Sequence, residues 1–276
     1  MDWLTETKIP VGKTAKTVFD WLQDNAYVFF DALSEFLEAL IDAILWVLQT
    51  PHPFLVIAAF AGLTWVLQRS WKTCLFVVIG FLFILNQDYW EETTESLTLV
   101  LSACIVCMAV GVPIGIAAAH RPGLYRAMRP VLDLMQTLPT FVYLIPAIVF
   151  FGIGMVPGLI ATVIFVLPAP IRLTYLGVSS TPTPLLEAAQ AFGATKRQVL
   201  WKVELPSALP QIMAGLNQTI MLSLSMVVIA ALVGASGLGV PVIRALNTVN
   251  TGLGFESGFV IVVVAIMLDR MLRVNK

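Results

Sequence analysis

Few residues of this 276-residue chain are of types that perform chemistry, and their spacing argues against catalysis. Cys104 and Cys107 form a CxxC pair inside an apolar stretch with no accompanying His, so we interpret them as core residues rather than a redox or metal site. His52 and His120 belong to opposite membrane edges in the topology argued below and cannot share a metal. The sequence contains no phosphate-binding GxxxxGK[S/T] loop. We therefore expect no catalytic residue, no metal site and no cofactor bound by this chain.

Two ionisable residues, Asp133 and Arg172, lie near the ends of apolar stretches. Charged groups in or beside a membrane are functional candidates, but we interpret these two as a candidate structural ion pair or interface anchor. Further side chains are candidates for lining a pathway, with helix packing or lipid contact as the alternative: Phe141, Tyr143, Asn217, Gln218, Ser223 and Ser225. Phe150 and Phe151 extend the aromatic part of this set, and aromatic faces suit quaternary ammonium ions, whose spread charge offers no hydrogen-bond donor.

The composition indicates what kind of chain carries these residues. Charged residues make up 12% of the sequence and hydrophobic residues 58%, with a mean hydropathy of +0.88. A soluble domain of ordinary composition is about 25% charged. The net charge of −1 and the three cysteines exclude a basic nucleic-acid binder and a disulfide framework. We therefore expect an all-α membrane protein that crosses the lipid bilayer several times and binds no nucleic acid.

Seven apolar stretches are candidates for membrane spans, although the first and the last are short. They cover approximately residues 53–68, 72–86, 96–119, 131–154, 156–178, 213–235 and 257–268. Four prolines are expected to break two of these spans, as in transporters whose backbone lines a cavity: Pro139, Pro146, Pro168 and Pro170. Gly111 and Gly115 have the GxxxG spacing that is typical of close helix packing.

The distribution of Lys and Arg predicts the orientation of these spans, because basic residues are retained on the cytoplasmic side. With the N-terminus outside and seven spans, all but four of the 16 basic residues fall inside. The exceptions are Lys8, Lys13, Lys16 and Arg244. We therefore predict an N-out, C-in protein of the bacterial inner membrane, with a transmembrane domain over residues 51–276.

Residues 1–50 differ from the rest and are expected to form an external tail. Between Thr17 and Gln49, acids recur at helical spacing on one face, and large apolar residues occupy the other. This pattern predicts an amphipathic helix along the outer surface. Because an acidic face is a poor match for anionic lipid, we expect it to pack against the protein's own rim or against a partner.

The inner segment 179–211 has the signals of two short helices. Thr183 followed by a proline predicts one helix start, and Gly193 supplies a left-handed stop. Thr195 with Gln198 predicts a capping box for a second helix, which we expect Pro206 to end. The spacing alone is also compatible with a solvated connecting loop.

The same segment carries a family resemblance. The run EAAQAFGATKRQVLWKVELPSALP, residues 187–210, resembles the EAA loop of ABC importer permeases, and LMQTLPTFVYLIPAIVFFGIGMVPGLIATVIFVLP, residues 134–168, resembles the permeases that import glycine betaine, proline betaine and choline. The resemblance implies a type I importer permease fold. It also implies a homodimer of permeases, two cytoplasmic ATPase subunits that bind ATP and Mg, and an external substrate-binding protein.

Residue by residue, the resemblance implies that the EAA loop docks on the ATPase. The matching positions are Glu187, Ala188, Ala189, Gly193, Ala194 and Pro206. The function implied is a permease for quaternary ammonium compounds that is not itself an enzyme. The alternatives are a permease for an amino acid such as proline or histidine, and a membrane-embedded enzyme that uses Asp133 or Glu187. The enzyme requires these titratable groups to converge.

Overall fold

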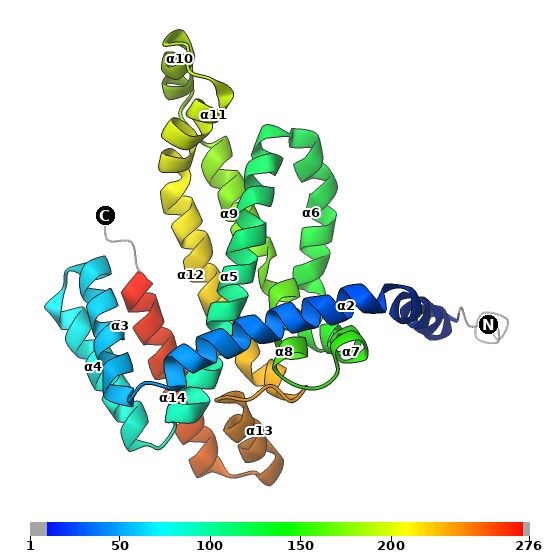
Figure 1. The fold of residues 1–276 in the computed structure, drawn as a ribbon, viewed down its shortest axis with the longest axis vertical. Coiled ribbons are helices and arrows are strands. Elements are labelled where there is room, and N and C mark those ends of the chain that lie inside the picture. The colour runs from blue at the N-terminus through cyan, green and yellow to red at the C-terminus, as the bar shows by residue number, and fades with distance from the viewer. Residues whose placement is uncertain (1–9, 273–276) are drawn as a thin grey trace, which may run out of the picture.

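The computed structural model describes residues 10–272, and this range is helical without any strand (Figure 1). The expected all-α class is therefore confirmed. The longer helices are α2 (Val11–Gln49), α3 (Pro53–Gln68), α4 (Trp71–Asn86), α5 (Trp90–His120), α6 (Pro122–Thr137), α12 (Leu205–Ala231) and α14 (Thr251–Leu272). The shorter ones are α7 (Thr140–Phe151), α8 (Met155–Val166), α9 (Pro168–Ser179), α10 (Thr183–Ala191), α11 (Lys196–Val199), the π-helical turn η1 (Leu200–Glu204) and α13 (Gly239–Thr248).

Helices α5, α9 and α12 pack against one another and form the centre of the molecule. Their close approach depends on small residues. A Cβ atom added at Gly111 would lie 2.8 Å from Cγ of Pro170, and one added at Gly115 would lie 2.7 Å from the carbonyl oxygen of Ile171. The GxxxG pair is thus a packing feature, as the sequence predicts, because it lets the backbone of α9 lie directly on α5.

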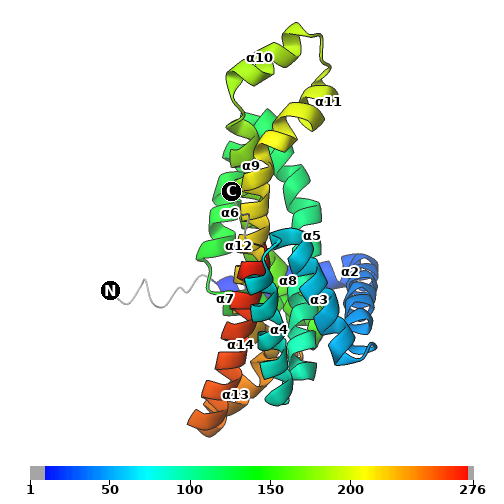
Figure 2. The same cartoon turned by 90° about the vertical axis from the view of Figure 1, so that its left-hand side faces the viewer.

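Figures 1 and 2 show an elongated molecule with different structures at its two ends. Helices α10 and α11 project from one end, and α13 with the start of α14 forms the other. Figure 1 shows α2 running across the bundle between these ends. The α10–α11 end of the molecule and α2 are therefore separated along the long axis.

The expectation of seven spans is not confirmed. Four helical segments within residues 10–272 are long and apolar enough to cross a membrane, and up to six if each of two bent pairs counts as one span. The four are Trp90–His120, Met155–Ser179, Lys196–Ala231 and Thr251–Leu272. Helix α4 is apolar but has only 16 residues, so it falls below the length that crosses a bilayer without thinning it or snorkelling.

The span expected over residues 131–154 is broken, as its prolines predict. Helices α6 and α7 meet at an angle of 97°. Leu138 is extended, with φ −65° and ψ 136°, because the ring of Pro139 disfavours a helical conformation in the preceding residue. The other expected break is milder, since α8 and α9 together form the segment Met155–Ser179 with Pro168 at the start of α9. Pro139 therefore redirects the chain, whereas Pro168 does not.

The N-terminal helix α2 is longer than the sequence predicts, and it contains non-helical dihedrals at Ala26. Its acids are exposed, as expected, and Leu37, Ile41 and Leu48 are buried in the core. The predicted apolar face is only partly covered, however, because Phe29 and Phe36 are each 63% exposed. The helix packs on α5, α7 and α8, so it lies against the protein's own rim.

Candidate functional site

The projecting hairpin of α10 and α11 contains most of the residues expected to couple to an ATPase. No side chain of the described helix α10 is buried. The helix starts at Thr183, with Pro182 at the cap position, one residue before the predicted start. Phe192, which follows α10, is 92% exposed, an unusual position for a large aromatic side chain unless another surface covers it.

The turn of the hairpin is built by local signals. Gly193 has φ +75°, the left-handed conformation that glycine adopts without cost, and its N–H donates to the Gln190 carbonyl. The next N–H, that of Ala194, donates to the carbonyl of Ala189. Thr195 and Gln198 then form the predicted capping box, which starts α11. The helix–turn–helix form of this segment is therefore confirmed, in place of a structureless connecting loop.

A groove of about 450 Å³ separates α10 from the start of α12. Ala188 and Ala189 line one side of it, and Lys202 and Pro206 line the other. Glu187 is exposed on α10 but does not line the groove. The EAA triplet is thus divided between the groove wall and the open surface.

Pro206 does not end the second helix, which corrects the sequence prediction. Residues 196–231 form one long helical segment in which η1 is a π-helical turn, and the Leu205 N–H donates to the carbonyl of Leu200, five residues back. Pro206 directly follows this turn. A π turn widens the helix, so that the missing N–H and the ring of a proline are accommodated. The α10–α11 hairpin is consequently continuous with a helix that is long and apolar enough to cross a membrane.

A buried acid next to this turn was not singled out by the sequence. Glu204 is 8% exposed, and its Oε2 lies 2.9 Å from Nε2 of His120, at the end of α5. The Nδ1 of His120 lies 2.9 Å from the Ile116 carbonyl oxygen. Both ring nitrogens of His120 therefore lie within hydrogen-bonding distance of an oxygen. The pair connects the end of α5 to the π turn, and no local sequence pattern around Glu204 or His120 indicated it.

Asp133 and Arg172 are brought together by the structure. One guanidinium nitrogen of Arg172 donates to Oδ1 of Asp133 at 2.6 Å, and the other donates to Oε1 of Gln136 at 3.0 Å. The rings of Tyr125 in α6 and Tyr175 in α9 also stack, with centroids 3.6 Å apart. Both contacts join α6 to α9, and they therefore fix the position of α6, the helix that precedes the bend, against α9.

This arrangement does not support a membrane-embedded enzyme. Asp133 is paired with Arg172, whereas Glu187 is exposed on α10. Catalysis by two carboxyl groups requires them to face a common site. Cys104 and Cys107 are both buried in α5, as predicted for core residues.

The pathway candidates occupy different environments. Gln218 and Ser225 are exposed on α12, and their spacing of seven residues places them on one face of that helix. Phe141 is 55% exposed on α7. Asn217 instead donates to Asp269 of α14, at 3.3 Å. Tyr143 is buried and donates to the Met135 carbonyl, and Ser223 is fully buried. In this conformation Tyr143 and Ser223 therefore face no open surface.

The aromatic residues of α7 also separate into two groups. Tyr143 packs with Met226 and Val233, whereas Phe150 and Phe151 contact the rings of α2. Apart from the exposed Phe141, the aromatic residues that the sequence places together thus serve two surfaces.

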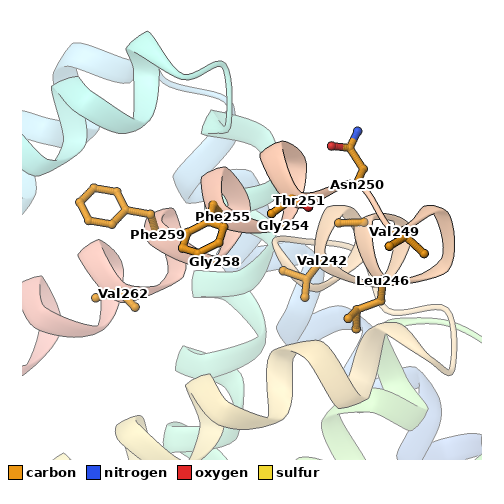
Figure 3. A pocket seen from close by; sticks show the side chains of 11 residues that line it. Val242, Leu246, Val249, Asn250, Thr251, Gly254, Phe255, Gly258, Phe259 and Val262 are labelled. Carbon is orange, nitrogen blue, oxygen red and sulfur yellow. The ribbon is translucent and has the colours of Figure 1, made fainter.

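A further cavity, of about 720 Å³, lies between α13 and α14 (Figure 3). Phe255, Phe259 and Val262 approach it from α14, and Val242 and Leu246 approach it from α13. Its described lining contains no charged residue. The cavity suits an apolar chain or helix and offers no counter-charge for an ionic solute.

Comparison with known proteins identifies the architecture. Residues 111–273 match the family described as "Binding-protein-dependent transport system inner membrane component". The methionine ABC transporter MetNI, solved in inward-facing conformations, matches with a TM-score of 0.60 and 23% identity over 67% of this chain and 94% of that chain. At this identity the likeness shows the fold alone.

Curated relatives are more similar in sequence. The chain is 47% identical to the glycine betaine transport system permease protein OpuAB of Bacillus subtilis, over 96% of this chain and 93% of that protein. It is 38% identical to the glycine betaine/proline betaine permease ProW of Escherichia coli, over 98% of this chain and 76% of that protein. The chain therefore belongs to the family of binding-protein-dependent transport system inner membrane components, the ABC importer permeases that its EAA loop predicts.

Proposed function

We propose that this chain is the permease subunit of an ATP-driven importer for quaternary ammonium compounds such as glycine betaine, proline betaine or choline. The observation that carries the proposal is the 47% identity, over 96% of the chain, to a permease named for glycine betaine transport. A second relative at 47% identity, from Listeria monocytogenes, is named for glycine betaine and carnitine. Both names concern small solutes with a quaternary nitrogen.

The coupling residues of the proposed importer lie in the hairpin. Two copies of the permease form the pathway, and two ATPase subunits bind ATP and Mg on the cytoplasmic side. Each ATPase receives one α10–α11 hairpin, with Ala188, Ala189 and Pro206 at the groove and Glu187 on the open surface. Because the hairpin continues through η1 into α12, its displacement moves a spanning helix directly.

The proposed orientation places the hairpin, within residues 179–211, in the cytoplasm and the tail 1–50 outside. The support is the distribution of basic residues and the position of the hairpin at one end of the molecule, with α2 well away from it. Single cysteines at positions 31 and 190 of a cysteine-free variant test it. A membrane-impermeant maleimide should label position 31 from outside and position 190 only after permeabilisation, and the reverse pattern would refute the orientation.

In the proposed pathway, Gln218 and Ser225 face the solute, and Phe141 is its aromatic contact. Asn217 and Ser223 hold α12 in the bundle. Solute selection belongs mainly to the external binding protein, which delivers the solute to the permease.

The test of the function is reconstitution of the permease with its ATPase and binding protein in proteoliposomes. Glycine betaine, proline betaine or choline should stimulate ATP hydrolysis and accumulate in the vesicles, whereas proline and histidine should do neither. Stimulation by an amino acid alone would reject the substrate class and leave the importer assignment intact. Uptake of quaternary amines without ATP would reject the importer mechanism.

A further inference from the structure

A small cavity between α2 and α7 combines aromatic rings with a carboxylate. It has a volume of about 290 Å³ and is lined by Gln23, Tyr27, Phe30, Asp31, Ser34, Phe150 and Phe151. The five residues from α2 are spaced by four, three, one and three positions, so they share one helical face. Four aromatic side chains thus surround a space that is small enough for a compact organic ion.

The aromatic wall is held in place by packing rather than left mobile. The rings of Phe30 and Phe150 stack with centroids 4.4 Å apart, and Phe151 meets Phe30 edge-on at 5.7 Å. Phe19 meets the other ring of the stack, that of Phe150, edge-on at 5.7 Å. The side-chain amide of Gln23 donates to the Val149 carbonyl at 3.3 Å, which ties α2 to α7 beside the rings. These contacts preorganise the wall, which reduces the cost of binding.

The charge of the cavity is negative. Asp31 is the one carboxylate in its lining, which contains no Lys or Arg, and no ion pair joins Asp31 to a Lys or Arg among residues 10–272. Asp24 and Glu35 lie on the same helix and are also exposed, so the surrounding field is negative as well. An anion is therefore disfavoured here, and a cation finds a free carboxylate next to aromatic rings.

We propose that this cavity binds a quaternary ammonium cation. Such an ion has no N–H to donate and is strongly attracted to aromatic faces, whereas a primary ammonium is a compact, strongly hydrated charge that loses more on leaving water. A choline-like monocation is favoured over a betaine, because a betaine carries its own carboxylate into the field of Asp31.

The biological meaning of the site, a second recognition point for the transported class of solute, rests on the proposed function. In the proposed orientation the cavity lies on the outer side, where solute arrives. The chemistry of the cavity itself does not depend on that function. The cavity between α13 and α14 serves as a contrast, because it is larger but has no charged residue in its described lining.

The test is calorimetric titration of the purified permease–ATPase complex, without binding protein, with tetramethylammonium chloride at constant ionic strength. Binding should be saturable and weaker for methylammonium. Asp31→Asn should weaken tetramethylammonium binding about tenfold, the change that the loss of a close counter-charge produces. Tyr27→Leu should weaken it about threefold and is expected to fold normally, because Tyr27 is 63% exposed at the rim. The matched control is Asp24→Asn, an exposed acid of the same helix outside the cavity lining, which should weaken binding much less than Asp31→Asn because Asp24 acts only through the surrounding field.

The outcomes separate the cavity from the transport function when glycine betaine uptake by the complete importer is measured in parallel. Uptake without tetramethylammonium binding, or equal binding by Asp31→Asn and Asp24→Asn, would overturn the cavity proposal alone. Binding that depends on Asp31, with no uptake of any quaternary amine, supports the cavity and overturns the proposed function. Stronger binding of methylammonium than of tetramethylammonium would overturn the ligand class.

Discussion

The α5–α9–α12 core and the α10–α11 hairpin both depend on small residues, but they use them in opposite ways. In the core, Gly111 and Gly115 are small because another helix of the same chain occupies the space. In the hairpin, nothing lies within 4 Å of the position of a Cβ on Gly193, and Ala188 and Ala189 border an open groove. Small residues therefore serve internal packing in one region, whereas in the other they leave a surface uncovered. Substitutions should distinguish the two.

The largest effect is expected for Gly115→Leu. A side chain at this position meets the backbone of Ile171, which cannot move without separating α5 from α9. We expect a loss of stability of about 3 kcal/mol or more, and little folded protein in the membrane. The measurements are membrane expression and the midpoint of thermal unfolding in detergent.

Gly62→Leu is the matched control for this change, because Gly62 is an exposed helical glycine with nothing within 4 Å of its Cβ position. It should express and unfold like the wild type. Equal behaviour of the two variants would remove the distinction between a packed glycine and an open one.

The next largest effect is expected for Gly193→Trp, and it should concern transport rather than stability. The side chain has free space in this chain but would occupy the proposed docking surface, and a non-glycine residue at φ +75° costs about 1–2 kcal/mol locally. We expect normal insertion and at least a tenfold fall in ATP-dependent uptake, measured in proteoliposomes with the ATPase.

Gly123→Trp controls for bulk alone, because Gly123 is an exposed glycine with open space at the start of α6. Its uptake should remain close to wild type. Normal uptake by Gly193→Trp would argue that the hairpin turn does not contact the ATPase.

A smaller effect is expected at the junction between the two regions, where His120 pairs with Glu204. His120→Ala leaves a buried carboxylate without this partner and should cost about 2 kcal/mol of unfolding free energy. In a double-mutant cycle with Glu204→Gln, the double variant should be about 1 kcal/mol more stable than the sum of the single effects predicts. Strict additivity, measured by denaturant unfolding, would mean that the pair does not couple α5 to the π turn.

The smallest effect is expected for Arg172→Lys. Lysine cannot reach Asp133 and Gln136 with the two-pronged geometry of a guanidinium, but the contact is substantially exposed. We expect a loss of about 0.5–1 kcal/mol in unfolding free energy. Arg129→Lys, at a longer 3.9 Å contact with Asp133, should change stability less. A larger loss for Arg129→Lys would reverse the assigned importance of the two pairs.

Much of the hairpin was predictable because its signals are local. The left-handed glycine at 193 and the capping box of Thr195 act within a few residues of themselves, and both are present as the sequence predicts. Pro206 was misread because its effect depends on the preceding turn. A proline ends an ordinary helix, but the π turn at 200–204 accommodates it.

The core was predictable in kind but not in its contacts. The GxxxG spacing indicated close packing, and only the structure identified α9 as the helix that lies on Gly111 and Gly115. The pathway candidates show the same limit. Asn217 and Gln218 are neighbours in sequence, but one contacts Asp269 of α14 and the other is exposed. A helical face can be read from spacing, whereas the partner of that face cannot.

By itself, the sequence determined the helical class, the membrane character, the family and the turn chemistry of the hairpin. The class, the membrane character and the turn chemistry follow from composition and from interactions between residues a few positions apart, and the family follows from the resemblance of two sequence blocks to known permeases. The tertiary structure decided the 97° bend between α6 and α7, the continuity of the hairpin with α12 and the pairing of His120 with Glu204. It also brought Asp31 and the rings of α2 to Phe150 and Phe151, more than a hundred residues away. Contacts at such separation depend on how whole helices pack, and no local pattern encodes them.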